Sequence, residues 1–246
     1  MGLIITFILG LFILLGALIA FLSKNNKSFI NFSLGLAFSV ISLLVLLELI
    51  PHTLETLNHV NTTTNSIIIL IMFAFSGIIL LKMLDRFIPD HHTNNKHNLE
   101  HIGLLTSIAL ILHNIIEGMA VYNISEMSLS AGLLISVGVG LHNIPLGMII
   151  ASTIHQGNQS KKKTTYIVLL ISLSTFLGGL LMLFLKDYFN TQIQGIILSI
   201  TLGMLVFISI FELLPKIVKT KNKKNIAKGI LVGIIFIIFA LLFHHH

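Results

Sequence analysis

The sequence predicts an all-α polytopic membrane protein with eight transmembrane helices. The chain of 246 residues is 55% hydrophobic and only 10% charged, with a mean hydropathy of +0.98. Such a composition is far more apolar than that of soluble domains. The apolar residues form continuous runs of about 20, which is the length that crosses the hydrocarbon core of a bilayer. Continuous runs, in place of alternating ten-residue segments, favour helices over a β-barrel.

The predicted spans cover the whole chain, 1–246, which we interpret as a single transmembrane domain. The first span lacks a basic leading region and a small-residue cleavage site, so we expect a permanent helix and not a cleaved signal. The sequence contains no Cys, which excludes disulfides and thiolate metal sites. The eight spans are approximately 2–22, 29–50, 66–84, 102–122, 129–153, 165–185, 194–218 and 227–243.

The lysines and arginines predict the orientation. Of the 15 Lys and Arg residues, Lys186 is the only one in an even-numbered loop; the others lie in or beside odd-numbered loops. The positive-inside rule then places the odd-numbered loops in the cytoplasm and both termini outside, in a multi-pass protein of the cytoplasmic membrane. The net charge of +6 follows from these loops. We therefore expect the lipid bilayer, and no nucleic acid, as a partner.

The fourth and fifth spans carry two copies of one motif. The first copy is "HNIIEGM", His113–Met119, and the second is "HNIPLGM", His142–Met148. A helix rises about 1.5 Å per residue, so His113 and Glu117 lie near mid-membrane on one face of their helix. His142 lies at a similar depth on the next, antiparallel helix. We expect these three side chains to meet.

The chemistry of this group indicates a metal site. An ionised side chain at the bilayer centre costs about 2.5–3.5 kcal/mol on insertion scales. A hydrogen bond between helices explains a single buried polar residue well. It explains less well the whole set of His113, Asn114, Glu117, His142 and Asn143. Imidazole and carboxylate ligands without sulfur suit a divalent transition metal.

Other residues of the two motifs have structural interpretations. Gly118 and Gly147 permit helices to approach closely. Pro145 lacks a backbone donor, which either bends its helix or frees a carbonyl for ligation. For Met119 and Met148 we expect packing, although thioether ligation stays open.

A second pair of motifs suggests inverted repeats. "ELIP", Glu48–Pro51, ends the second span, and "ELLP", Glu212–Pro215, ends the seventh. These spans run in opposite directions, so helices 1–3 and 6–8 are predicted to be repeats around the central pair 4–5. Glu48, His52 and Glu55 share one helix face, which we place at the outer mouth.

The polar residues predict a route for cations. Negative charge at Glu48 and Glu55 concentrates cations near the mouth. The inner route is predicted to pass Glu212 and His155. It ends at a cytoplasmic loop, 85–100, whose histidines either bind metal weakly or belong to a polar linker. The histidines in or beside this loop are His91, His92, His97 and His101.

These motifs, with eight helices and a histidine-bearing third loop, resemble the ZIP family of metal transporters. "GMLVFISIFELLP", from Gly203, resembles its bacterial branch. The resemblance implies uptake of Zn²⁺, with Fe²⁺, Mn²⁺ or Cd²⁺ as further substrates, by a 3+2+3 helix arrangement that moves as an elevator. It also implies frequent homodimers and, in many members, a two-metal site. By this resemblance His113, Glu117 and His142 are primary metal positions, and Asn114 and Asn143 serve the second site.

The chain departs from the family pattern at three positions. Leu146 stands where the family usually has glutamate, and Thr175 or Phe176 stands where another glutamate is frequent. Ile116 replaces a frequent proline. Two Zn²⁺ ions repel each other and need bridging anions between them. With Glu117 as the only central carboxylate, we expect a single-ion site.

Two alternatives remain at this point. The departure at Leu146 is compatible with a metal sensor or a transport-impaired relative, which binds ions without moving them. A membrane-embedded zinc hydrolase would use Glu117 as a general base. The sequence has no "HExxH" and offers no obvious partner for Glu117, so we expect no enzyme.

Overall fold

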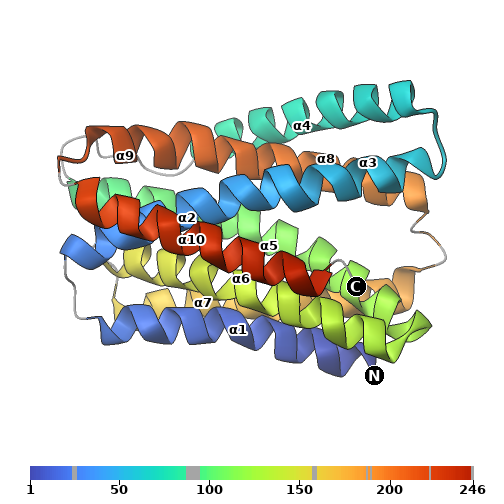
Figure 1. Ribbon diagram of the computed structural model, residues 1–246, viewed down its shortest axis with the longest axis horizontal. Helices are drawn as coiled ribbons and strands as arrows, with labels where there is room; N and C mark the ends of the chain where they lie inside the picture. The colour runs from blue at the N-terminus through green and yellow to red at the C-terminus, as the bar shows by residue number, and fades with distance from the viewer. Residues whose placement is uncertain are drawn as a thin grey trace.

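The computed structural model describes residues 1–23, 27–86, 95–156, 160–186, 188, 190–221 and 223–244, with the side chains of 95–98, 100, 127, 131, 156 and 241–244 left out. Helices make up nearly all of this part of the chain, and no strand occurs in it (Figure 1). The elements are α1 (Gly2–Leu22), α2 (Lys27–Leu44), the π-helical turn η1 (Val45–Leu49), α3 (Ile50–Asn58), α4 (Thr63–Asp85), α5 (Asn95–Met127), α6 (Leu129–Gln156), α7 (Lys161–Leu185), α8 (Thr191–Phe207), the π-helical turn η2 (Ile208–Leu213), α9 (Leu214–Lys219) and α10 (Lys223–His244).

The predicted spans correspond to long helical runs. Seven segments of the described chain are long and apolar enough to cross a membrane, two of them being the continuous runs Lys27–Asn58 and Thr191–Lys219. The eighth predicted span is α10, which packs along α2. Both termini lie at one end of the bundle, which we call the termini end; α2, α5, α7 and α10 begin at the other, the lysine-rich end (Figure 1). The protein is a polytopic, all-α membrane protein.

Local signals explain where several helices begin. The side chain of Ser160 accepts a hydrogen bond from the backbone N–H of Lys163 at 3.2 Å, which caps α7. The side chain of Asn190 accepts one from the N–H of Ile193 at 2.9 Å, which caps α8. Such caps satisfy N–H groups that a helix leaves without partners.

The third loop is shorter than the sequence predicts. The prediction of a loop over 85–100 is wrong in part, because α5 already begins at Asn95. His97 therefore lies in a helix, and its side chain is outside the described part. His91 and His92 fall wholly outside the described residues. The prediction that they bind metal stays a prediction.

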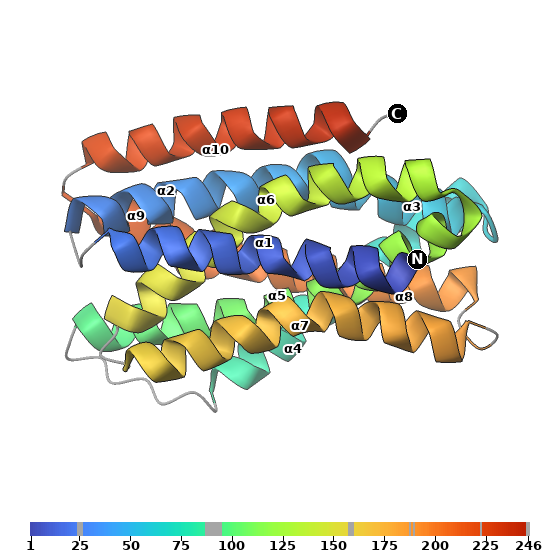
Figure 2. The ribbon, with the colours of Figure 1, turned by 90° about the horizontal axis from the view of Figure 1, so that it is seen from below.

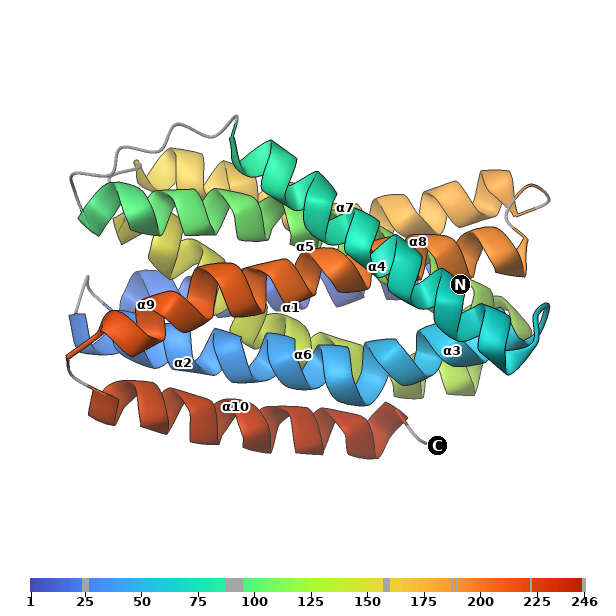
Figure 3. The same ribbon diagram turned by 90° about the horizontal axis from the view of Figure 1, so that it is seen from above.

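The helices form two packing groups. The first, which we call the core group, contains α1, α5, α6 and α7: α1 packs on α6 and α7, and α5 packs on α6 and α7. The second, the flanking group, contains α2 with α3, α4, α8 with α9, and α10: α2 packs on α10, and α4 packs on α8. Figure 1 shows α4 at one edge of the bundle, Figure 2 shows α10 at another edge, and Figure 3 shows α4 crossing in front of α8. The buried share of the apolar membrane-spanning stretch is 61% in α5, in α6 and in the runs Lys27–Asn58 and Thr191–Lys219, but only 11% in α4, so α4 lies at the periphery of the bundle.

Pairs of glycines join helices within each group. In every pair, each glycine contacts a backbone carbonyl of the other helix. The residue that carries this carbonyl lies three positions before the other glycine of the pair. A Cβ added at Gly118 would lie 1.9 Å from the carbonyl oxygen of Thr175, and one at Gly178 would lie 1.9 Å from that of Ile115. Such contacts are possible only without a side chain, and they bring helix backbones together. The four pairs are Gly16 with Gly147, Gly118 with Gly178, Gly35 with Gly229, and Gly77 with Gly203.

The two π-helical turns occupy matching places. Glu48 lies in η1 and Glu212 in η2, each three residues before a proline that stands in the first turn of the following helix. Proline has no N–H to donate to the preceding turn, which weakens the regular α-helical hydrogen-bond pattern there. π-helical turns of this kind are frequent at functional sites. Both turns hold a carboxylate inside a membrane-spanning run.

Candidate metal centre

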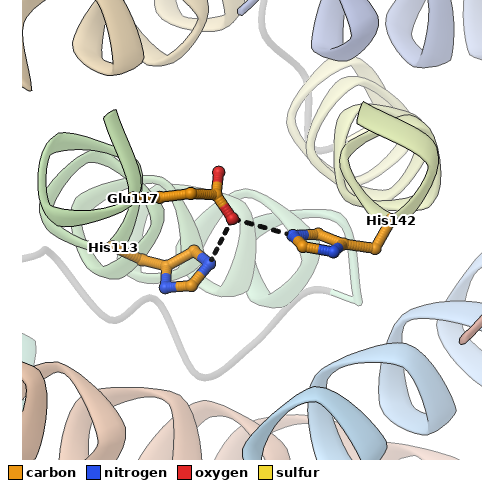
Figure 4. Close-up of side chains that lie close together, drawn as sticks. All are labelled: His113, Glu117 and His142. Atoms are coloured by element: carbon orange, nitrogen blue, oxygen red, sulfur yellow. Dashed lines mark hydrogen bonds and ion pairs between the residues drawn. The ribbon is translucent and has the colours of Figure 1, made fainter. Parts of the chain in front are cut away.

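Three side chains from α5 and α6 meet in the interior (Figure 4). Nε2 of His142 lies 3.0 Å from Oε1 of Glu117, and Nε2 of His113 lies 3.5 Å from the same oxygen. The two imidazole rings are 6.3 Å apart between centroids. One ligand atom from each residue lies within 4.8 Å of the others. The expected meeting of His113, Glu117 and His142 is therefore present in the fold.

The triad is buried, and its polar groups are incompletely paired. His113 is 5% exposed and His142 is 1% exposed. Nε2 of His113 is buried without a hydrogen-bond partner in the described part of the chain. A buried nitrogen without a hydrogen-bond partner lowers the stability of the fold unless another group binds it. Two imidazole nitrogens and one carboxylate oxygen, converging on one point, match the ligand set of a Zn²⁺ ion with an open position.

Asn143 and Asn114 support the triad from two sides. Nδ2 of Asn143 donates to Oε2 of Glu117 at 3.3 Å. Nδ2 of Asn114 donates to the backbone carbonyl of Ile171 on α7 at 3.2 Å. The side-chain carbonyl oxygens of both asparagines are buried and have no hydrogen-bond partner among the described residues. Asn143 thus orients Glu117, while Asn114 ties α5 to α7.

The expected outer-mouth position of Glu48 is wrong. Oε2 of Glu48 lies 3.9 Å from Nδ1 of His142, on the side of the ring opposite to Glu117. Glu48 therefore belongs to the central site. His52 and Glu55 follow it on α3, about 6 Å and 10 Å further along the helix. His52 is half-buried and Glu55 is exposed, as expected of residues nearer the mouth.

The two positions at which the resemblance to the ZIP family leads one to expect a glutamate hold uncharged residues in this chain. Leu146 is 1% exposed and packs in the main hydrophobic core. Thr175 is fully buried, and its carbonyl faces Gly118 beside the triad. Phe176 instead contacts Phe7 edge to face, with the ring centroids 5.8 Å apart. Thr175, and not Phe176, is therefore the residue of α7 that faces α5.

The two methionines of the motifs pack in the interior. Met119 is 6% exposed and Met148 is 8% exposed. Met148 belongs to the main core, and Met119 lines a small cavity with Met182 of α7. Neither sulfur belongs to the triad, as the packing interpretation predicts. Pro145 lies inside α6, which continues through it.

A second cluster joins three helices on the lysine-rich side of the triad. Nε2 of His101 lies 2.5 Å from Oδ1 of Asp85. Ligand atoms of Asp85, His101 and Glu212 all lie within 4.8 Å of one another. The expectation of His101 as part of a polar loop is wrong: it lies in α5 and is 8% exposed. We call Asp85, His101 and Glu212 the exit cluster.

The exit cluster differs from the predicted inner route. Glu212 was expected there, but Asp85 was missed; its signal was an acidic residue in the last turn of an apolar span. His155 lies outside this cluster, with its ring edge to face on Phe21 at 5.7 Å between centroids. Glu212 thus lies in this cluster, whereas His155 lies beside α1.

Comparison with known proteins shows the family of the chain. The sequence model described as "ZIP Zinc transporter" matches residues 89–243, which include the whole triad. The chain belongs to the ZIP zinc transporter family. Among ZIP relatives, "Zinc transporter ZupT" of Streptococcus mutans is 32% identical, over 97% of this chain and 96% of its own length. Proteins of the same name from Oceanobacillus iheyensis (31%, 97% and 96%) and Lysinibacillus sphaericus (32%, 86% and 85%) are also similar. Since the family and its named relatives are transporters, the protein is not an enzyme.

Proposed function

We propose that the protein carries divalent transition-metal ions, zinc foremost, across the cytoplasmic membrane into the cell. The observation that supports this most is a buried set of two imidazoles and one carboxylate between α5 and α6 of a ZIP-family bundle. The names of the similar proteins support zinc as the ion. An inside-negative potential favours cation entry by about 2.3 kcal/mol per charge per 100 mV.

The experiment that tests this function is zinc flux into liposomes. Purified protein is reconstituted, and entry of Zn²⁺, Cd²⁺, Mn²⁺ and Fe²⁺ is followed with a metal-sensitive dye inside the vesicles. The proposal predicts saturable Zn²⁺ entry that an inside-negative potential accelerates. Zinc binding without flux would instead support the sensor or transport-impaired alternative. Light scattering on the same preparation tests whether the protein is a homodimer.

We propose that the centre holds one ion at a time. Among the residues that the structure describes, Glu117 is the only carboxylate that reaches the meeting point of the triad, and Glu48 lies behind His142. A single Zn²⁺ is then balanced by two nearby carboxylates, so little net charge remains in the low-dielectric interior. A second ion would find Leu146 and Thr175 where anions are needed.

Leu146→Glu is expected to add a second central ion. Residue 146 lies one helical turn after His142 on the same face of α6. Isothermal titration with Zn²⁺ should show one bound equivalent in the wild type, and this equivalent should be lost in Glu117→Ala. Leu146→Glu should bind two equivalents that depend on Glu117. Leu146→Gln, which adds polarity without charge, should keep one. Two such equivalents in the wild type would contradict the single-ion proposal.

We further propose that the core group moves against the flanking group, like an elevator. The glycine pairs lie inside the groups, and none of the four joins one group to the other. His113, Glu117 and His142 belong to the core group, whereas Glu48 belongs to the flanking group. Sliding of the core group would therefore separate His142 from Glu48 and carry the triad towards Asp85 and Glu212 of the flanking group, whereas His101, on α5, would move with the triad. The matching π-helical turns and glycine pairs also support the proposed inverted repeats.

The proposed route runs from the termini end to the lysine-rich end. His52 and Glu55 attract the ion, the triad binds it, and the exit cluster receives it. This direction follows from the positive-inside rule, which puts the lysine-rich end in the cytoplasm and both termini outside. His91, His92 and His97 remain proposed weak metal ligands beyond the exit cluster.

Glu48→Gln is expected to weaken central zinc binding by about 10- to 100-fold. The carboxylate faces Nδ1 of His142 and so favours the tautomer that presents Nε2 to the metal. Affinity is measured by competition with a fluorescent zinc chelator. Glu126→Gln, at an exposed site at the end of α5, is the control and should bind as the wild type does. Equal affinities for Glu48→Gln and the control would show that Glu48 takes no part.

His101→Ala is expected to slow zinc entry on the order of tenfold. The variant should still bind one Zn²⁺ ion at the triad. The exit cluster would retain Asp85 and Glu212 but lose its only nitrogen ligand. Flux and titration are compared in the same preparation. The control, His59→Ala, removes an exposed histidine at the far end of α3. Flux equal to that of the control would remove His101 from the route.

A further inference from the structure

A groove opens between α1 and α7 on the surface that faces the membrane. Its volume is about 310 Å³, within the range of about 300–1,000 Å³ found for small-ligand sites. Leu14, Leu18 and Leu22, spaced by four residues, line it from α1, and Lys161 and Thr165 line it from α7. Leu18 is 53% exposed and Leu22 is 71% exposed. The groove therefore follows about 12 Å of helix α1, with mostly apolar walls.

The mouth of the groove carries a fixed positive charge. The end of α1 and the beginning of α7 both lie at the lysine-rich end of the bundle (Figure 2). Nζ of Lys161 lies 5.2 Å from the centre of the Phe21 ring, in a cation–π contact. The ring of His155 also contacts Phe21, edge to face. The contact holds the ammonium at the rim of the groove.

Within the described part of the chain, this charge has no acidic partner. No carboxylate of the described chain forms an ion pair with Lys161, and Lys162 and Lys163 beside it are also exposed. Lysines at a membrane surface attract anionic headgroups, whereas their aliphatic stems lie along apolar surface. A zwitterionic headgroup would bring its own cation close to three lysines. The site thus favours a net anionic headgroup above an apolar chain.

We propose that this groove binds one anionic phospholipid, with an acyl chain between α1 and α7 and the headgroup phosphate on Lys161. The apolar walls exclude a free phosphate ion as the main ligand, because most of the site offers it no hydrogen bonds. Both helices belong to the core group, so the lipid would lie against the helices that support α5 and α6. This inference does not depend on zinc transport.

Native mass spectrometry of the full-length protein tests the site. The detergent-solubilised protein is mixed with phosphatidylglycerol or phosphatidylcholine of identical acyl chains, and the bound fractions are compared. The wild type should bind one phosphatidylglycerol in preference to phosphatidylcholine. Lys161→Gln should weaken phosphatidylglycerol about fivefold and leave phosphatidylcholine unchanged. Lys161→Arg should keep the preference, and Lys223→Gln, on α10 at the same end, should behave as the wild type.

A second variant tests the apolar part of the groove. Thr165→Phe places a ring at the exposed wall of the groove and should weaken both lipids, because it occupies the space of the acyl chain. Equal losses of phosphatidylglycerol binding in Lys161→Gln and Lys223→Gln would overturn the proposal. Such a result would show that the anionic lipid is attracted by all the lysines at this end of the bundle and not by the groove. Binding of phosphatidylglycerol by Lys161→Gln at the wild-type level, or its displacement by millimolar inorganic phosphate, would also overturn it.

Discussion

Glu117→Gln is expected to reduce zinc influx to the level of empty liposomes. The amide fills the same space but carries no charge, and it replaces the one carboxylate that both histidines of the triad share. A dication at the bilayer centre would then rely on neutral ligands, with only Glu48 to offset its charge. Loss of an outer partner of a metal ligand typically costs about 10- to 100-fold in affinity, and loss of the ligand itself should cost more. Both flux and titration measure this effect.

The matched control for Glu117→Gln lies on the same helix. Glu126→Gln removes the carboxylate of an exposed residue about two and a half turns beyond Glu117 and should retain wild-type flux. Both variants must elute as monodisperse protein in equal yield. Flux by Glu117→Gln within twofold of that of Glu126→Gln would show that the triad is not the transport site.

Gly118→Ala is expected to disrupt the packing of α5 on α7. The added methyl would lie 1.9 Å from the carbonyl oxygen of Thr175, which is backbone and cannot turn away. A carbon and a carbonyl oxygen need about 3.3 Å even in their closest favourable contacts, so the helices must separate by more than 1 Å. Overpacking of this kind costs about 1–3 kcal/mol or more. Because Gly118 follows Glu117, the separation should also displace the triad, so that zinc affinity falls together with thermal stability.

Gly140→Ala provides the comparison for this packing effect. A Cβ there would lie 3.0 Å from ring atoms of Phe12, a side chain that can rotate aside. Its melting temperature in detergent should stay close to that of the wild type, while that of Gly118→Ala falls clearly. Similar melting temperatures for the two variants would mean that the close α5–α7 contact contributes little to the fold.

The membrane made most of the fold predictable from the sequence. A bilayer imposes length and apolarity on every crossing, so continuous apolar runs located the helices. Four-residue spacing put His113 and Glu117 on one face, and the repeated motif supplied His142 on the neighbouring helix. Gly118 and Gly147 were predicted to permit close approach; the structure adds that they contact α7 and α1.

The errors came from features that depend on tertiary contacts. His101 follows a polar stretch, so the pattern favoured a loop; in the fold, the half-buried Asp85 gives the buried ring a partner. Glu48 was placed too far outward because its helical run was taken to end near residue 50, whereas it extends from Lys27 to Asn58. The π-helical turns have no signature in hydropathy, because an extra residue in a turn leaves the composition unchanged.

Anomalous X-ray scattering from crystals grown with Zn²⁺ tests the central claim most directly. Data collected above and below the zinc absorption edge locate each ion independently of the protein phases. The proposed function predicts one anomalous peak between α5 and α6, within about 2.0–2.2 Å of a nitrogen of His113, a nitrogen of His142 and an oxygen of Glu117. Two peaks between these helices, or an empty triad in crystals that hold zinc elsewhere, would contradict it.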